Sequence, residues 1–454
     1  MGAPDAIALH DPGSTLSRPW RLSRAAPTLI EVVMNRFAQP VFIAPGLRTP
    51  FGRGGGALAA YDAISLSVPV MQAMAAQATP DLLIWGTVIP NLGWSNIARE
   101  AWLDAKLDPT VPAFSVVLAC STSMTAAVAA AGMLGKGTDL TMVGGAEVMS
   151  RPSIALTAEA SKRLTDLFAK DAMAALAALQ ALTPTDYVLP TKGWANRITG
   201  KSMGDHMEDT AKAWRISREA QDDWALKSHQ RVVAGWERGF FDDLVVSLPE
   251  LARDANPRAD TSSERLAALK PAFDRTSGMG TLTAGNSSPI TDGAAGCWVA
   301  SEDGLARLPE GTPYARLVDY EISAVDFHME GILMAPSYGI PRLLARNNLD
   351  FSDIALWEIH EAFAAQVLAN VAAITDPEWV RETAGVGAAM GDFDWDRVNP
   401  NGGSVALGHP FAATGARDLS QAVKELWALP PGSRAIVSIC ADGGQGTVAL
   451  LERG

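Results

Sequence analysis

Short apolar runs alternate with segments of helical periodicity along most of this 454-residue chain. The apolar runs have the length of buried strands, and we expect strands at 41–44, 82–85, 140–143, 354–359, 435–440 and 447–452. Between them, the pattern predicts helices that begin at Tyr61 and Asn96 and helices at 121–135, 361–373 and 415–428. Strands that alternate with helices in this way predict an α/β fold in which helices cover a central sheet.

Two parts of the chain depart from this alternation. Residues 1–39 form an extension in which we expect only a short helix at 28–37, and from about residue 150 to residue 270 the pattern changes to helices with few strands. The second part contains an apolar stripe formed by Leu164, Leu167, Phe168, Met173, Leu176, Leu179 and Leu182. Ordinary core or lid packing is the favoured interpretation of this stripe. A surface that contacts a membrane or a partner subunit is the alternative.

Cys120 follows the apolar segment 111–119, which predicts a strand, and precedes the helix expected at 121–135. A thiol at a helix N-terminus experiences the helix dipole and unpaired backbone N–H groups, which favour the nucleophilic thiolate. A lone cysteine at a strand end is more often buried and inert. Two further segments favour the catalytic interpretation.

The first of these segments is the glycine-rich loop 399–408, which delivers His409 directly before Pro410 and a small-residue helix. Because proline favours the first turn of a helix, we expect His409 at a helix N-terminus. The second is the apolar strand 435–440, which ends at Cys440 and a glycine-rich turn. An imidazole between two thiols is a working catalytic set, in which one thiol attacks, the base activates it and the other thiol moves a proton.

With these three segments in this order, the chain resembles the thiolase family from about residue 41 to the C-terminus. The resemblance includes Arg48–Gly52, Gly144–Ser150, Ser217–Asp222, Lys270–Phe273 and Thr283–Ser288. It implies a duplicated α-β-α-β-α layered fold with a helical loop domain over the coenzyme A (CoA) site. The implied domains are an extension at 1–39, an N-terminal domain at 40–302 that includes the loop domain at about 150–270, and a C-terminal domain at 310–454.

His360 begins the motif His-Glu-Ala-Phe, where many thiolases carry Asn. This form resembles the β-subunit of the trifunctional fatty-acid oxidation complex and its bacterial relatives. The resemblance implies that His360 and His409 donate hydrogen bonds to a thioester oxygen and that the backbone N–H groups of Cys120 and Asp442 form a second oxyanion hole. Asp442 replaces the Gly or Ala of most relatives, and we expect its carboxylate to raise the pKa of Cys440. A satisfied core histidine is the alternative interpretation of His360.

The resemblance also implies positions that contact CoA, namely Met203, Phe273, Ser288 and Phe363. Short-chain thiolases often have a His directly before the Met-Gly pair at 203–204, whereas this chain has Ser202. This difference argues against a short-chain preference.

The function that the resemblance implies is that of a 3-ketoacyl-CoA thiolase, reversible as an acetyl-CoA acetyltransferase, with CoA and acyl-CoA as substrates and no permanently bound cofactor. The implied partners are a second copy of the chain, in a homodimer or homotetramer, and an enoyl-CoA hydratase/3-hydroxyacyl-CoA dehydrogenase subunit. Two alternatives are a decarboxylating condensing enzyme of the ketoacyl-synthase type and a non-catalytic scaffold subunit. Cys440 argues against the condensing enzyme, because decarboxylation supplies the carbanion without a thiol acid/base.

Composition adds limits to this picture. The formal net charge of −13 argues against nucleic-acid binding, which requires a basic face. Three cysteines without framework spacing predict no structural disulfides and a reducing setting, the cytoplasm of a bacterium or the mitochondrial matrix of a eukaryote. Cys297 lies in an apolar run and is expected to be inert. The dispersed His and Cys residues predict no metal site, and no apolar stretch is long enough to span a bilayer. Acidic residues are paired with basic ones in the apolar stripe, which argues against membrane contact.

Overall fold

The computed structural model describes residues 36–89, 91–135, 137–188 and 195–454. They belong to one compact unit that spans Arg36–Gly454. Most of the N-terminal extension, including nearly all of the helix expected at 28–37, lies outside the described residues.

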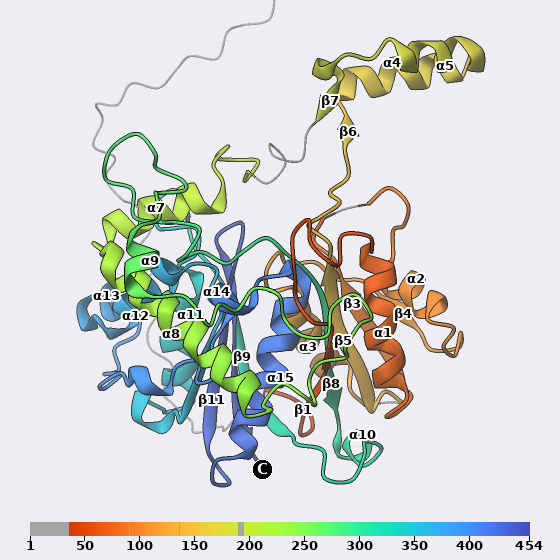
Figure 1. The fold of residues 1–454 in the computed structure, drawn as a ribbon. Coiled ribbons are helices and arrows are strands. Elements are labelled where there is room, and N and C mark those ends of the chain that lie inside the picture. The colour runs from red at the N-terminus through yellow and green to blue at the C-terminus, as the bar shows by residue number, and fades with distance from the viewer. Residues whose placement is uncertain (1–35, 90, 136, 189–194) are drawn as a thin grey trace, which may run out of the picture. The chain divides into compact units, whose positions relative to one another are not determined.

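The core of the structure is a mixed ten-stranded sheet with the order β10-β11-β12-β9-β1-β8-β5-β3-β4, with β2 (Gly52–Arg53) paired to β8 (Figure 1). Its other strands are β1 (Phe42–Arg48), β3 (Leu82–Gly86), β4 (Ala113–Phe114), β5 (Leu140–Glu147), β8 (Thr291–Ala300), β9 (Ala315–Ala324), β10 (Leu356–Ile359), β11 (Arg434–Ala441) and β12 (Gln445–Arg453). The predicted strands are all present, and most of them extend beyond the predicted bounds.

The sheet consists of two halves with the same pairing pattern. In the first half β3 is parallel to β5, and β8 is antiparallel to both β5 and β1. In the second half β10 is parallel to β11, and β12 is antiparallel to both β11 and β9. The two halves meet where β1 pairs antiparallel with β9. This repeated topology confirms the predicted duplicated α/β architecture.

Helices cover both faces of the sheet. They are α1 (Ala63–Ala75), α2 (Ile97–Asp104), α3 (Thr122–Met133), α11 (Ala335–Arg346), α12 (Ala364–Thr375) and α15 (Thr414–Trp427). The helices α3 and α15 share one apolar core with strands of both halves. On the opposite face of the sheet, α1 and α2 cover the first half, and α11 and α12 cover the second half. Side chains alternate between these cores along a strand. In β5, for example, Met142 belongs to the core under α1 and its neighbour Val143 to the core under α3.

Two predicted bounds were wrong for identifiable reasons. The strand expected to end before Gly144 continues through Gly145, because the missing side chains leave room for the Trp85 ring and the Ala412 backbone. The helix expected from Tyr61 begins at Ala63, because Asp62 forms a capping box with Ser65, whose backbone N–H donates to the Asp62 carboxylate at 2.8 Å.

The part between β5 and β8 contains helices and few strands, as predicted. It contains α4 (Ala158–Phe168), α5 (Ala172–Gln180), α7 (Met203–Ala213), α8 (Arg218–Glu237), α9 (Ser263–Ala267) and the paired two-residue strands β6 (Ala155–Leu156) and β7 (Tyr187–Val188). Core packing was the wrong interpretation for much of the apolar stripe, since Leu164 is buried but Phe168, Met173, Leu176 and Leu179 are exposed. No helix of the described residues is long and apolar enough to cross a membrane.

The remaining helices are short. They are α10 (Glu302–Leu305), α13 (Pro377–Glu382), α14 (Ser404–Leu407) and the 3-10 turns at Pro184–Asp186, Phe351–Asp353, Trp395–Arg397 and Phe411–Ala413. Of these, α14 and the turn Phe411–Ala413 flank His409.

Candidate active site

Cys120 lies on a sharp turn between β4 and α3. The strand expected at 111–119 is wrong for most of its length: only Ala113–Phe114 pairs with β3, and Val117 is 61% exposed. Ala119 has a φ of 42°, in the left-handed region that non-glycine residues rarely adopt. The Thr122 hydroxyl holds this turn, since its oxygen accepts from Leu118 N–H at 2.9 Å and its hydrogen is donated to the Ala119 carbonyl at 2.8 Å. The turn places the Cys120 side chain directly before the helix, as predicted.

His409 is presented by a tightly packed turn before α15. Gly408 has a φ of 105°, and a Cβ at this position would collide with Thr291. The Thr291 hydroxyl oxygen accepts from the backbone N–H of His409 at 3.2 Å. We expected His409 directly at a helix N-terminus, but the 3-10 turn Phe411–Ala413 separates it from α15.

His360 follows the last residue of β10, where buried polar side chains hold the chain. The Asn399 side chain accepts from Ile359 N–H and donates to its carbonyl, both at 2.8 Å. The Glu361 carboxylate accepts from Ser228 Oγ at 2.7 Å and from Asn399 Nδ2 at 2.8 Å. These bonds join the end of β10 to α8 and to the loop that carries His409.

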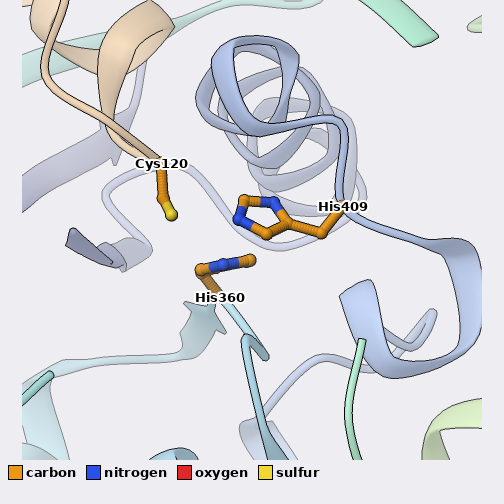
Figure 2. Close-up of side chains that lie close together, drawn as sticks. All are labelled: Cys120, His360 and His409. Carbon is orange, nitrogen blue, oxygen red and sulfur yellow. The ribbon is translucent and has the colours of Figure 1, made fainter. Parts of the chain in front are cut away.

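The fold brings Cys120, His360 and His409 together (Figure 2). The Cys120 sulfur and one nitrogen of each ring lie within 4.8 Å of one another, and the two ring centroids are 4.1 Å apart. Both imidazoles are buried, with His360 Nδ1 2.9 Å from Ser404 Oγ and His409 Nδ1 2.6 Å from Thr414 Oγ1. The two Nε2 atoms have no hydrogen-bond partner among the described residues. They are the groups that remain for a substrate.

Cys440 and Asp442 approach the same site from the end of β11. Cys440 is fully buried, and the nearby Cys120 thiol contributes to raising its pKa. Against the effect of burial, the backbone N–H groups of Asp442 and Cys120 act to lower the pKa of the Cys120 thiol. These are the two backbone donors expected to form the second oxyanion hole.

The electrostatics of the resting site differ from the prediction for Cys120. Burial, followed by the charge of Asp442, raises the pKa of Cys120 to about 12, so the effect of the helix N-terminus does not dominate. The pKa of Cys440 is raised, as expected, but the causes are burial, the neighbouring Cys120 and Asp418 rather than Asp442. Burial and the Arg417 charge lower the pKa of His409 to about 3. The resting pair is therefore a neutral thiol beside a neutral imidazole.

Most of the residues expected to contact CoA pack in or against the apolar cluster that contains Cys440. Met203, Phe273 and Phe363 belong to the same apolar cluster as Cys440, and the two Phe rings pack edge to face with centroids 6.0 Å apart. Ser288 adjoins them, since its backbone N–H donates to the Ala362 carbonyl at 3.0 Å.

Ser202, directly before the Met-Gly pair at 203–204, caps α7. Its hydroxyl accepts from Asp205 N–H at 3.2 Å, and the Asp205 carboxylate accepts from Ser202 N–H at 3.0 Å. In this structure Ser202 therefore has a role in helix capping.

Several residues of the site were not identified from the sequence. Glu147 is buried and accepts from the backbone N–H groups of Val88 and Ile89 at 3.0 Å, and its charge contributes to the raised pKa of Cys120. Asn196 Nδ2 donates to the Asp442 carboxylate at 2.8 Å. Each of these contacts joins residues far apart in the chain, so no local sequence pattern indicates them.

Cys120, His360 and His409 are dispersed in the sequence, and the fold gathers one side-chain atom of each within 4.8 Å. The same three atoms are those available for nucleophilic catalysis.

Two family models match the chain, the thiolase N-terminal domain over residues 41–303 and the thiolase C-terminal domain over residues 311–453. The chain is 36% identical to a 3-ketoacyl-CoA thiolase of Erwinia tasmaniensis over 95% of its length and 99% of the relative. It is also 36% identical to one of Pectobacterium atrosepticum, over 92% of its length and 98% of the relative.

Among solved structures, the fold is similar to an acetyl-CoA acetyltransferase of Bacillus anthracis, with a TM-score of 0.76 and 30% identity over 92% of this chain and 99% of that one. It is also similar to a thiolase of Ascaris suum in complex with coenzyme A, with a TM-score of 0.74 and 27% identity over 92% of this chain and 100% of that one.

Proposed function

The chain belongs to the thiolase family and is an acyltransferase, and we propose that it is a 3-ketoacyl-CoA thiolase of fatty-acid β-oxidation, reversible as an acetyl-CoA acetyltransferase. The observation that carries this proposal is the convergence of Cys120, His360 and His409 within 4.8 Å, with Cys440 beside them. A nucleophilic thiol, a base, an oxyanion donor and a second proton-transfer group are what carbon–carbon cleavage by thiolysis requires.

In the first half-reaction, the Cys120 sulfur attacks the keto carbon of a 3-ketoacyl-CoA as His409 Nε2 takes the Cys120 proton. The bond between the keto carbon and the adjacent α-carbon breaks. The acyl group stays on Cys120, and the electron pair passes to the enolate of acetyl-CoA. Cys440 gives its proton to the α-carbon and completes acetyl-CoA.

In the second half-reaction, the Cys440 thiolate takes the thiol proton of incoming CoA. The CoA thiolate attacks the acyl-enzyme carbonyl, and Cys120 leaves and recovers its proton from His409. Because the pKa of Cys120 is raised in the free enzyme, proton transfer to His409 must be coupled to attack rather than precede it.

Two groups of donors serve the two oxygens that become negative. The Nε2 atoms of His360 and His409 are assigned to the thioester oxygen, which becomes the enolate oxygen. The backbone N–H groups of Cys120 and Asp442 are assigned to the keto oxygen.

The proposal includes the surroundings of the site. We assign CoA contacts to Met203, Phe273, Ser288 and Phe363. Three of them, Met203, Phe273 and Phe363, share an apolar cluster with Cys440. We expect CoA and acyl-CoA as the only small molecules that the reaction needs. We expect a homodimer or homotetramer, an enoyl-CoA hydratase/3-hydroxyacyl-CoA dehydrogenase subunit as partner, and a location in the bacterial cytoplasm or the mitochondrial matrix. We also propose that the chain has an N-terminal domain at 40–302 and a C-terminal domain at 310–454.

A thiolysis assay with 3-ketoacyl-CoA substrates of increasing chain length tests the function. We expect CoA-dependent cleavage by the native chain, and no acyl-enzyme or cleavage in Cys120→Ala, because no nucleophile remains. Cys297→Ala is the matched control and should keep activity, since Cys297 is buried in β8. CoA-independent decarboxylation would indicate a condensing enzyme instead, and no turnover of any chain length would indicate a scaffold subunit.

A further inference from the structure

Each active-site histidine is hydrogen-bonded to a hydroxyl group, His360 to Ser404 and His409 to Thr414, and the second partners of the two hydroxyls differ in kind. The oxygen of Ser404 is 2.9 Å from His360 Nδ1 and accepts from Arg417 Nη2 at 2.8 Å. A guanidinium can only donate, so Arg417 uses a lone pair of Ser404 and leaves the hydroxyl hydrogen for another acceptor. His360 Nδ1 is the acceptor within reach among the described residues.

The second partner of the Thr414 hydroxyl is an acceptor, whereas that of Ser404 is a donor. The Thr414 hydroxyl is 2.6 Å from His409 Nδ1 and donates to the Pro410 carbonyl at 3.1 Å. That carbonyl also accepts from Ala413 N–H at 2.9 Å, and its two lone pairs accommodate both donors. With its hydrogen used, Thr414 Oγ1 can accept a proton from His409 Nδ1.

The reverse assignment for His360 would leave a donor without an acceptor. If His360 Nδ1 carried the proton, Ser404 would receive two donors and its own hydrogen would have no acceptor among the described residues. Ser404 and Arg417 are both buried, so water does not readily compensate for the loss. Burial also lowers the pKa of both histidines, so each ring carries a single proton at neutral pH.

We propose that the two histidines rest in opposite tautomers, with the His360 proton on Nε2, set by Ser404 and Arg417, and the His409 proton on Nδ1, set by Thr414. His360 Nε2–H then donates to the thioester oxygen, and His409 Nε2 presents the lone pair that receives the Cys120 proton. Ser404, Arg417 and Thr414 act through the histidines and are positioning residues. The catalytic part of this inference rests on the proposed thiolase function, whereas the tautomers themselves do not.

The direct test is the ring-nitrogen NMR spectrum of the resting full-length protein labelled with ¹⁵N-histidine. The chain has six histidines, and His360→Asn and His409→Asn identify the two signals. We expect a protonated Nε2 in His360 and a protonated Nδ1 in His409. The same tautomer in both rings, or the reverse pair, would overturn the inference. Because no substrate is present, this result is independent of whether the protein performs thiolysis.

The kinetic test uses Ser404→Ala with Thr414→Val as its matched counterpart. Ser404→Ala should slow exchange of the α-protons of acetyl-CoA by about tenfold, a typical effect of one hydrogen bond, while acylation of Cys120 by an acyl-CoA donor stays near the native rate. Thr414→Val should instead slow acylation, because the base is no longer held in its accepting tautomer.

The NMR signal separates this role from a structural one. Ser404→Ala should alter the tautomer signal of His360 and leave that of His409 unchanged, and Ser404→Thr, which keeps a hydroxyl, should restore both the signal and the exchange rate. An unchanged His360 signal in a folded Ser404→Ala protein would refute the role of Ser404. If Ser404→Ala does not fold, the spectrum of the native protein still decides between the tautomers.

Discussion

The carboxylate of Asp442 should lower the reactivity of the Cys120 thiol toward alkylation in the free enzyme. Asp442→Asn removes this charge and keeps the side-chain size. Asn196 Nδ2 and Gly443 N–H donate to the same Asp442 oxygen at 2.8 and 2.6 Å, and an amide oxygen can accept both bonds. Because the Asp442 charge raises the pKa of Cys120, its removal should lower that pKa.

The size of the effect follows from the dielectric constant and the solvent. Close charge pairs near a protein surface interact by a few kcal/mol at an effective dielectric constant of ~20, and solvent at the half-buried thiol reduces the effect on the pKa to about one unit. One unit gives about ten times more thiolate at any pH below the pKa, but a less basic thiolate is about threefold less nucleophilic. The net expectation is about threefold faster alkylation.

Iodoacetamide alkylation of Cys120 between pH 7 and pH 9, measured by peptide mapping, tests this expectation. Cys120→Ser identifies any contribution from the buried Cys297 and Cys440. Asp104→Asn in the exposed end of α2 changes the net charge by the same amount and should leave the rate unchanged. An Asp442→Asn rate equal to or below the native rate would refute this account of the charge.

Three further predictions concern individual side chains. His360→Ala should lower kcat by about 10²-fold with little change in KM, as for loss of one oxyanion donor, and steady-state thiolysis kinetics would show a structural role if kcat were preserved. Cys440→Ala should retain acylation of Cys120 but lose α-proton exchange in acetyl-CoA; persistent exchange would require another acid. Cys297→Ser should lower the free energy of unfolding, measured in urea, by about 1–3 kcal/mol because a hydroxyl is buried in an apolar core, with kcat/KM unchanged.

Local sequence pattern predicted the elements well where a run is buried on both sides. The strands at 82–85 and 435–440 were predicted within a residue or two of β3 and β11, because every residue of these runs is buried in the structure. The segment 111–119 is equally apolar but forms only the short edge strand β4, since its remaining residues have no neighbouring strand. Hydrophobicity predicts burial, and strand pairing depends on which neighbours the tertiary structure supplies.

The chemical groups of the site were also predictable from the chain. Cys120, His409 and Cys440 follow or precede apolar runs in glycine-rich or small-residue segments, and the order of these segments matched a known family. The fold class, the duplication and the family were thus contained in the sequence.

Only the tertiary structure decided how these groups are tuned. Cys120 is a weak acid because burial and the charge of Asp442 outweigh the helix N-terminus, and those two residues are far apart in the chain. The sequence does not distinguish the proton positions of His360 and His409. In the structure, Arg417 donates to the Ser404 hydroxyl beside His360, whereas the Thr414 hydroxyl beside His409 donates to the Pro410 carbonyl. Proton positions and pKa values depend on distances between atoms of separate segments, and those distances exist only once the two halves of the chain have packed together.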